Sequence, residues 1–235
     1  MRYIYYGFDP TYWMVIVGVI LSLLASLMVK STFSKYSRVR SMSGMTGAQA
    51  AEKILNSQGI YDVNIQRVSG NLTDHYNPSN KTLNLSDSVY SNTSVAAIGV
   101  AAHECGHAIQ HAKGYAPLAF RSALVPVANF GSSISWILIL IGLFINSRSS
   151  MMLIYTGIIC FSLAVLFQIV TLPVEFNASS RAVNLLGQIG ILGDTELSQT
   201  KKVLSAAALT YVAAAAASIL QLLRLLALFG GNRRD

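Results

Sequence analysis

Two histidines four residues apart flank a glutamate in the stretch His103-Glu104-Cys105-Gly106-His107. Residues at this spacing lie on one face of an α-helix, so both imidazoles can reach one metal ion. In this His-Glu-x-x-His (HExxH) pattern the histidines bind zinc, and the glutamate beside them handles a proton. The pattern predicts a zinc-dependent hydrolase in which Glu104 is the general base.

A third zinc ligand must come from elsewhere in the chain, because catalytic zinc takes three protein ligands and keeps one position for water. Only ten acidic residues are available. We expect Glu175, just after the third apolar segment, to be this ligand, with Asp194 as the alternative. One straight helix cannot easily wrap three histidines around one ion, so we expect His111 to support the site or to lie at the surface without binding the metal.

The motif needs a helix that presents it, and the sequence around it is typical of one. Asn92 or Thr93 is a suitable N-cap. The residues that follow predict a helix from Ser94 to Ala112, which Lys113 and Gly114 close.

Smaller elements precede this helix. Thr46 is expected to cap a short helix that ends at Gly59, and strand-like runs follow at Val63–Val68 and Thr82–Leu85. We expect these two runs to form a hairpin. The strand at Thr82–Leu85 either offers an edge to which an extended peptide adds or belongs to an ordinary hairpin.

The composition indicates a membrane protein. The chain has 53% hydrophobic and 11% charged residues, whereas soluble domains carry about 25% charged residues. This hydrophobicity excludes a disordered chain, and the two cysteines exclude a disulfide scaffold.

Four apolar segments are long enough to cross a bilayer, which takes about 20 residues in a helix. The second span is expected to start nearer Gly131 than Leu124, and the fourth is the weakest because it is rich in alanine and Arg224 follows it. The four segments are Tyr12–Val29, Leu124–Asn146, Met151–Val174 and Val203–Leu223.

Basic residues predict which side of the membrane carries the motif. Four of them follow the first span within ten or so residues: Lys30, Lys35, Arg38 and Arg40. The positive-inside rule then places 30–123 and 175–202 in the cytoplasm, and Ser147–Ser150 and the tail 230–235 outside. Arg233 and Arg234 in the tail disagree with this topology. The net charge of +7 is thus explained by topology and contact with anionic lipid. We expect no nucleic-acid partner, because no basic stripe alternates with aromatic residues.

These features together resemble a known group of enzymes. The motif followed by Glu175-Phe176-Asn177-Ala178 is similar to the gluzincin membrane proteases of the HtpX and CAAX-prenyl-protease types. The first span, the run Thr46–Ala51, the motif helix and the run Glu175–Ala182 resemble the YugP-like family of bacterial neutral zinc metallopeptidases over most of the chain.

The resemblance implies one zinc ion per chain, held by His103, His107 and Glu175, with Glu104 as the catalytic residue. It also implies a multi-pass protein of the bacterial plasma membrane.

The chain departs from the HtpX type at one position. Those proteins usually carry an aspartate four residues after the ligand glutamate, where this chain has Ser179. We therefore expect Ser179, Asn177 or Arg181 to support the ligands. The donor that stabilises the oxyanion stays open among His75, Tyr76 and Arg181.

The sequence thus predicts a mostly α membrane protein with about four transmembrane helices and a small α+β, zincin-like cytoplasmic domain containing a short hairpin or sheet. The expected parts are an anchor at 1–30, a catalytic region at 31–123, a transmembrane hairpin at 124–174, a third-ligand region at 175–202 and a last helix with tail at 203–235.

The predicted function is zinc-dependent hydrolysis of peptide bonds in membrane or membrane-proximal proteins. Two alternatives stay open. One is a site-2-type intramembrane protease with Asp194 as ligand. The other is a non-catalytic scaffold whose structural zinc has a fourth ligand, His111 or Cys105.

Overall fold

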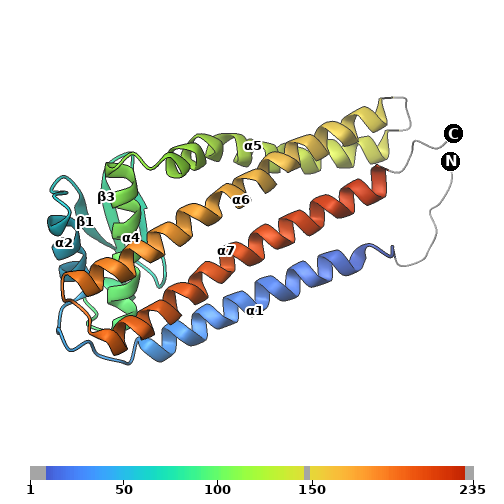
Figure 1. Cartoon of the computed structure of the whole chain (residues 1–235). Helices are drawn as coiled ribbons and strands as arrows, with labels where there is room; N and C mark the ends of the chain where they lie inside the picture. The colour runs from blue at the N-terminus through green and yellow to red at the C-terminus, as the bar shows by residue number, and fades with distance from the viewer. Residues whose placement is uncertain (1–8, 146–148, 231–235) are drawn as a thin grey trace. The chain divides into compact units, whose positions relative to one another are not determined.

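A computed structural model describes residues 9–145 and 149–230 (Figure 1). Parts of the topology argument lie outside these ranges, namely the loop residues 147 and 148 and the tail residues Arg233 and Arg234. The elements are α1 (Tyr12–Tyr36), α2 (Gly47–Ser57), β1 (Asn64–Val68), β2 (His75–Asn77), β3 (Thr82–Ser86), α3 (Asp87–Tyr90), α4 (Val95–Ala112), α5 (Ala116–Phe144), α6 (Ser150–Gln188) and α7 (Asp194–Phe229).

The described residues form two compact units. The first lies within 1–24, 123–170 and 211–235, and the second within 25–122 and 171–210. Each long helix contributes residues to both units, and α2, α3, α4 and the strands belong to the second.

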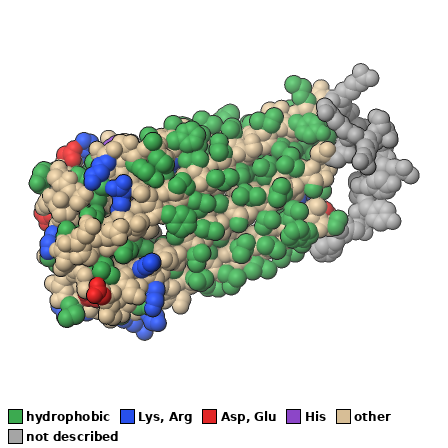
Figure 2. All heavy atoms as spheres, in the orientation of Figure 1, with side chains coloured by type: hydrophobic (Ala, Val, Ile, Leu, Met, Phe, Trp, Pro, Cys, Tyr) green, Lys and Arg blue, Asp and Glu red, His purple; other side chains and the backbone are tan. Residues whose placement is uncertain are grey.

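Among the described residues, four helices are long and apolar enough to cross a membrane: α1, α5, α6 and α7. Large apolar side chains are exposed along all four, and Figure 2 shows them in green. A surface of this kind is stable in a hydrocarbon environment. The prediction of a mostly α membrane protein with about four transmembrane helices is confirmed.

The last of these helices continues past a charged residue. The Arg224 guanidinium lies 2.9 Å from the Asp9 carboxylate and 4.5 Å from the centre of the Tyr12 ring. A charged side chain in an apolar helix is costly unless it is paired. This pairing explains how α7 extends to Phe229 although Arg224 follows the apolar run.

The second unit contains a three-stranded sheet in the order β1-β3-β2. β3 pairs in parallel with β1 and antiparallel with β2. The expected hairpin between Val63–Val68 and Thr82–Leu85 is therefore wrong, because the hairpin partner of β3 is β2. Strand β2 has only three residues, His75–Asn77, and its polar sequence lacks the apolar alternation that marks a strand.

Of the two alternatives for Thr82–Leu85, a free edge and an ordinary hairpin strand, the structure excludes the free edge. β3 is the central strand and is buried along its whole length. Among the described strands the edges belong to β1 and β2.

Local capping explains where the two helices of this unit begin. Thr46 caps α2 as predicted, in a capping box with Gln49. The N-cap of α4 is Ser94, whose hydroxyl accepts the backbone N–H of Ala97. The expectation of Asn92 or Thr93 is wrong, because Asn92 instead accepts the backbone N–H of Ser94.

One hydrophobic core joins α2, α4 and the sheet to the C-terminal part of α6. Figure 1 shows α4 beside the sheet, with α6 crossing α4. Central members of this core are Ile54, Leu83, Ile98, Ile109 and Leu186, all fully buried.

Candidate metal centre

The motif helix α4 approaches α6 very closely at Gly106. A Cβ atom on this residue would lie 2.6 Å from the carbonyl oxygen of Ala178 and 3.0 Å from its Cα. Only glycine permits this approach. Gly106 lies between the two motif histidines in sequence, and Ala178 follows Glu175 by three residues on α6. Their contact therefore brings the side chains of both histidines and Glu175 together.

The structure gathers His103, His107 and Glu175 into one cluster. Their ligand atoms all lie within 4.8 Å of one another. The Oε2 atom of Glu175 is 3.3 Å from Nε2 of His103 and 3.5 Å from Nε2 of His107. Glu175 is only 2% exposed, so its carboxylate depends on polar groups of the protein rather than on solvent.

A chain of hydrogen bonds orients the ring of His107. The amide nitrogen of Gln110 donates to the Val174 carbonyl at 2.8 Å, and a carbonyl can only accept. The amide oxygen of Gln110 therefore faces Nδ1 of His107, 3.0 Å away. Because that oxygen also only accepts, Nδ1 of His107 donates to it, and Nε2 is the ring nitrogen directed toward Glu175.

The Oε2 atom of Glu175 faces Nε2 of His107 and is buried without a hydrogen-bond partner among the described residues. A cation between these atoms satisfies them. Zinc binds nitrogen and oxygen at about 2.0–2.1 Å in tetrahedral geometry, which separates two ligand atoms by roughly 3.3–3.4 Å. The observed 3.3 and 3.5 Å fit that spacing.

His103 has a different partner. Its Nδ1 atom lies 3.1 Å from the hydroxyl of Ser179. Both histidines thus use Nδ1 for a neighbour and direct Nε2 toward Glu175, the arrangement by which surrounding groups orient metal ligands. Of the three supporting residues expected on α6, Ser179 touches a cluster histidine.

Asn177 and Arg181 are linked to the cluster indirectly, through Gln110. The Asn177 side-chain oxygen accepts hydrogen bonds from Gln110 at 3.0 Å and from Arg181 at 2.7 Å. Arg181 also lies over the ring of Tyr115. These contacts hold Gln110 in the orientation in which its amide oxygen faces Nδ1 of His107.

Glu104 is placed next to the cluster and held from one side. Its Oε2 atom accepts the backbone N–H of Tyr76 in β2 at 3.0 Å, and the residue is 8% exposed. This contact fixes one carboxylate oxygen and leaves the other for chemistry.

The remaining candidates make contacts outside the cluster. His111 bonds through Nδ1 to the Tyr76 hydroxyl at 2.8 Å, and His75 lies 3.1 Å from the Asn84 side chain. Burial raises the pKa of the Tyr76 hydroxyl, which therefore stays protonated at neutral pH.

Asp194 and Cys105 do not join the cluster within the described ranges. Asp194 lines a cleft with Lys35 and Lys202. The Cys105 thiol is buried against the Ala51 carbonyl, and this burial raises its pKa. The structure thus favours Glu175 over Asp194 as third ligand, and it places no fourth candidate ligand at the cluster among the described residues.

Two residues next to the cluster were not predicted from the sequence. Gln110 follows His107 by three residues on the same helix, a spacing from which the contact could have been predicted. Arg121 lies 4.0 Å from the Glu175 carboxylate. It comes from α5, and no motif marks it.

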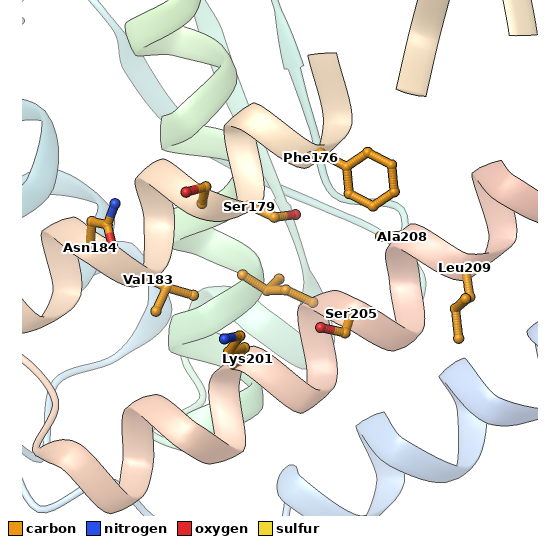
Figure 3. A pocket seen from close by; sticks show the side chains of 10 residues that line it. Phe176, Ser179, Val183, Asn184, Lys201, Ser205, Ala208 and Leu209 are labelled. Atoms are coloured by element: carbon orange, nitrogen blue, oxygen red, sulfur yellow. The ribbon is translucent and has the colours of Figure 1, made fainter. Parts of the chain in front are cut away.

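A cavity of about 440 Å³ lies between α6 and α7, beside the cluster. Figure 3 shows Phe176 and Ser179 lining it from α6, and Lys201, Ser205 and Leu209 from α7. Ser179 therefore both lines this cavity and contacts His103.

Comparison with known proteins decides the family. Residues 11–230 match the family model described as "Putative neutral zinc metallopeptidase". The chain belongs to this family. The curated "Putative membrane protease YugP" of Bacillus subtilis (strain 168) is 48% identical over 215 residues, which cover 92% of this chain and 94% of that protein. No solved structure matches. The resemblance seen in the sequence is confirmed.

Membership in a zinc metallopeptidase family implies zinc, and the His103, His107 and Glu175 cluster is where the described residues fit it. The relative is named a "Putative membrane protease", in agreement with the four apolar helices of this chain.

Replacing Gln110 by methionine keeps its length and removes its amide, so we expect zinc affinity to fall by about 10–100-fold, the usual effect of losing a group that orients a ligand. Competition with a chelating dye measures it. Gln66, exposed in β1, is the matched control, and Gln66→Met should not change the affinity. Equal affinities for Gln110→Met and the unchanged protein would show that His107 does not need Gln110.

Proposed function

We propose that this protein hydrolyses peptide bonds of membrane or membrane-proximal proteins, using zinc held by His103, His107 and Glu175. The observation that carries the proposal is the buried Oε2 of Glu175, which has no hydrogen bond among the described residues and faces the Nε2 atoms of two histidines at zinc-ligand spacing. Three ligands with one position left for water are typical of catalytic zinc rather than structural zinc. The HExxH pattern with a distant glutamate is typical of the gluzincin type.

The mechanism uses the residues around this centre. When bound, zinc polarises the scissile carbonyl and makes water acidic enough to lose a proton near neutral pH. Glu104 takes this proton as general base and then passes it to the leaving amine. The Tyr76 N–H holds Oε2 of Glu104, so Oε1 is the atom that carries the proton.

The substrate is proposed to lie along β2. This strand pairs with β3 on one side only, and its residue Tyr76 contacts Glu104. An extended peptide that adds to a strand edge is held mainly by its backbone. Such an enzyme accepts many sequences, provided that the segment is unfolded and close to the membrane.

The active site is proposed to face the cytoplasm. The basic residues that follow the first apolar run support this side by the positive-inside rule. Lys113 and Arg121, near the motif helix, agree with it. In a bacterial cell the protein would then act at the inner face of the plasma membrane.

Removal of the metal tests the proposal. After treatment with 1,10-phenanthroline, the purified protein in detergent should cleave fluorescently labelled casein at least tenfold more slowly, a conservative estimate because metal catalysis accounts for several kcal/mol. Added zinc should restore the cleavage, and added magnesium should not. Cleavage that persists without metal would exclude a zinc peptidase.

A further inference from the structure

A cleft of about 630 Å³ lies between α1 and α7, within the unit that carries the metal centre. Three lysines line it: Lys35 from α1, and Lys201 and Lys202 from α7. Neither the motif nor the proposed catalytic steps use this cleft.

No ion pair within residues 9–145 and 149–230 neutralises the charge of these lysines. The Lys35 ammonium lies 5.3 Å from the centre of the Tyr36 ring. Asp194 lines the adjoining cleft with Lys35 and Lys202, but it is not within ion-pair distance of either. An anion would complete this site.

Hydroxyl groups beside the lysines are also available. Across residues 9–145 and 149–230 the side chains of the four hydroxyl residues Ser31, Thr32, Ser198 and Ser205 show no hydrogen bond, and all four line the cleft. Elsewhere on the same helices, Ser22 and Thr210 donate to carbonyls of their own helix. The hydroxyls of the cleft can therefore donate to a ligand.

The cleft lies where both helices change from apolar to basic. The exposed large apolar residues of α1 run from Tyr12 to Met28, and those of α7 begin at Leu209. Met28 and Leu209 line one part of the cleft and the lysines another. Figure 2 shows Lys and Arg side chains close to the apolar surface of these helices. A ligand that fits has an anionic group and an apolar chain.

We propose that this cleft binds an anionic phospholipid. The phosphate headgroup lies among Lys35, Lys201 and Lys202 and accepts hydrogen bonds from the hydroxyls. An acyl chain follows the apolar side toward Met28 and Leu209. Basic pockets between transmembrane helices bind lipid headgroups by this chemistry.

The lipid would also touch the surroundings of the metal centre. Lys201, Ser205 and Leu209 line both this cleft and the cavity beside Ser179 (Figure 3). A bound lipid therefore contacts three side chains that shape that cavity.

Native mass spectrometry of the full chain in detergent tests the site, with dioleoyl phosphatidylglycerol as the probe. The triple variant Lys35→Gln, Lys201→Gln, Lys202→Gln should raise the lipid concentration for half occupancy by about tenfold or more, because each lysine near an anionic group contributes severalfold. The triple variant Lys30→Gln, Lys53→Gln, Lys113→Gln loses the same charge outside the cleft and should bind as the unchanged protein does.

A second pair of variants changes no charge. Ser31→Phe fills the cleft and should weaken binding, whereas Ser26→Phe, on the same helix but outside the cleft, should not. Circular dichroism checks that each variant is folded. Three results would overturn the proposal: equal losses in both lysine triples, equal binding of dioleoyl phosphatidylcholine, or displacement of the lipid by millimolar inorganic phosphate. None of these readouts depends on peptidase activity.

Discussion

Replacing Glu104 by glutamine is expected to reduce peptide-bond hydrolysis by about a thousandfold, within the usual contribution of general acid–base catalysis, and to leave bound zinc unchanged. The amide has the volume of the carboxylate, and its oxygen can still accept the Tyr76 N–H. It cannot take a proton from water. Cleavage of labelled casein and metal analysis of the same sample measure both effects.

The matched control for this change is Glu52→Gln. Glu52 is exposed on α2, away from the cluster, so its loss of charge should not alter cleavage or zinc content. Cleavage by Glu104→Gln at the rate of this control would exclude Glu104 as the general base. Loss of zinc from Glu104→Gln would mean that Glu104 helps to hold the metal.

Replacing Gly106 by alanine is expected to separate α4 from α6. The new Cβ atom would lie 2.6 Å from the Ala178 carbonyl oxygen, a backbone atom that cannot rotate away. Overpacking of this kind usually costs about 1–3 kcal/mol of unfolding free energy. Because His103 and His107 lie on one helix and Glu175 on the other, we also expect zinc affinity to fall at least as much as for loss of an orienting group, about 10–100-fold.

Gly193→Ala provides the control for this second change. The only atom within 4 Å of a Cβ at Gly193 is Oε2 of Glu196, at 3.9 Å, and the residue needs no positive φ. Thermal unfolding in detergent and zinc titration compare the two variants. A Gly106→Ala protein as stable and as tightly metal-bound as Gly193→Ala would show that the close helix contact does not position the ligands.

Much of the site could be predicted because its signals are local. The helix that carries His103 and His107 follows from their spacing and from the capping residues around it. The scarcity of acidic residues in an apolar chain drew attention to Glu175, since an unpaired carboxylate beside a span is costly. The Thr46 cap was predicted for the same reason, because a capping box lies within four residues.

The features that could not be predicted depend on contacts between segments that are distant in the sequence. The strand order could not be predicted, because β1 reaches β3 across a connection that contains β2, and β2 is three polar residues long. The role of Gly106 is visible only once Ala178 lies against it. The position of Arg121 near Glu175 likewise depends on the direction of α5 relative to the motif helix.

The ligand assignment is tested most directly by the zinc content of two purified variants, Glu175→Gln and Asp194→Asn, beside the unchanged protein. Mass spectrometry of the metal should find one zinc per chain in the unchanged protein and in Asp194→Asn, and little or none in Glu175→Gln. Full zinc occupancy in Glu175→Gln, or its loss in Asp194→Asn, would contradict the centre formed by His103, His107 and Glu175.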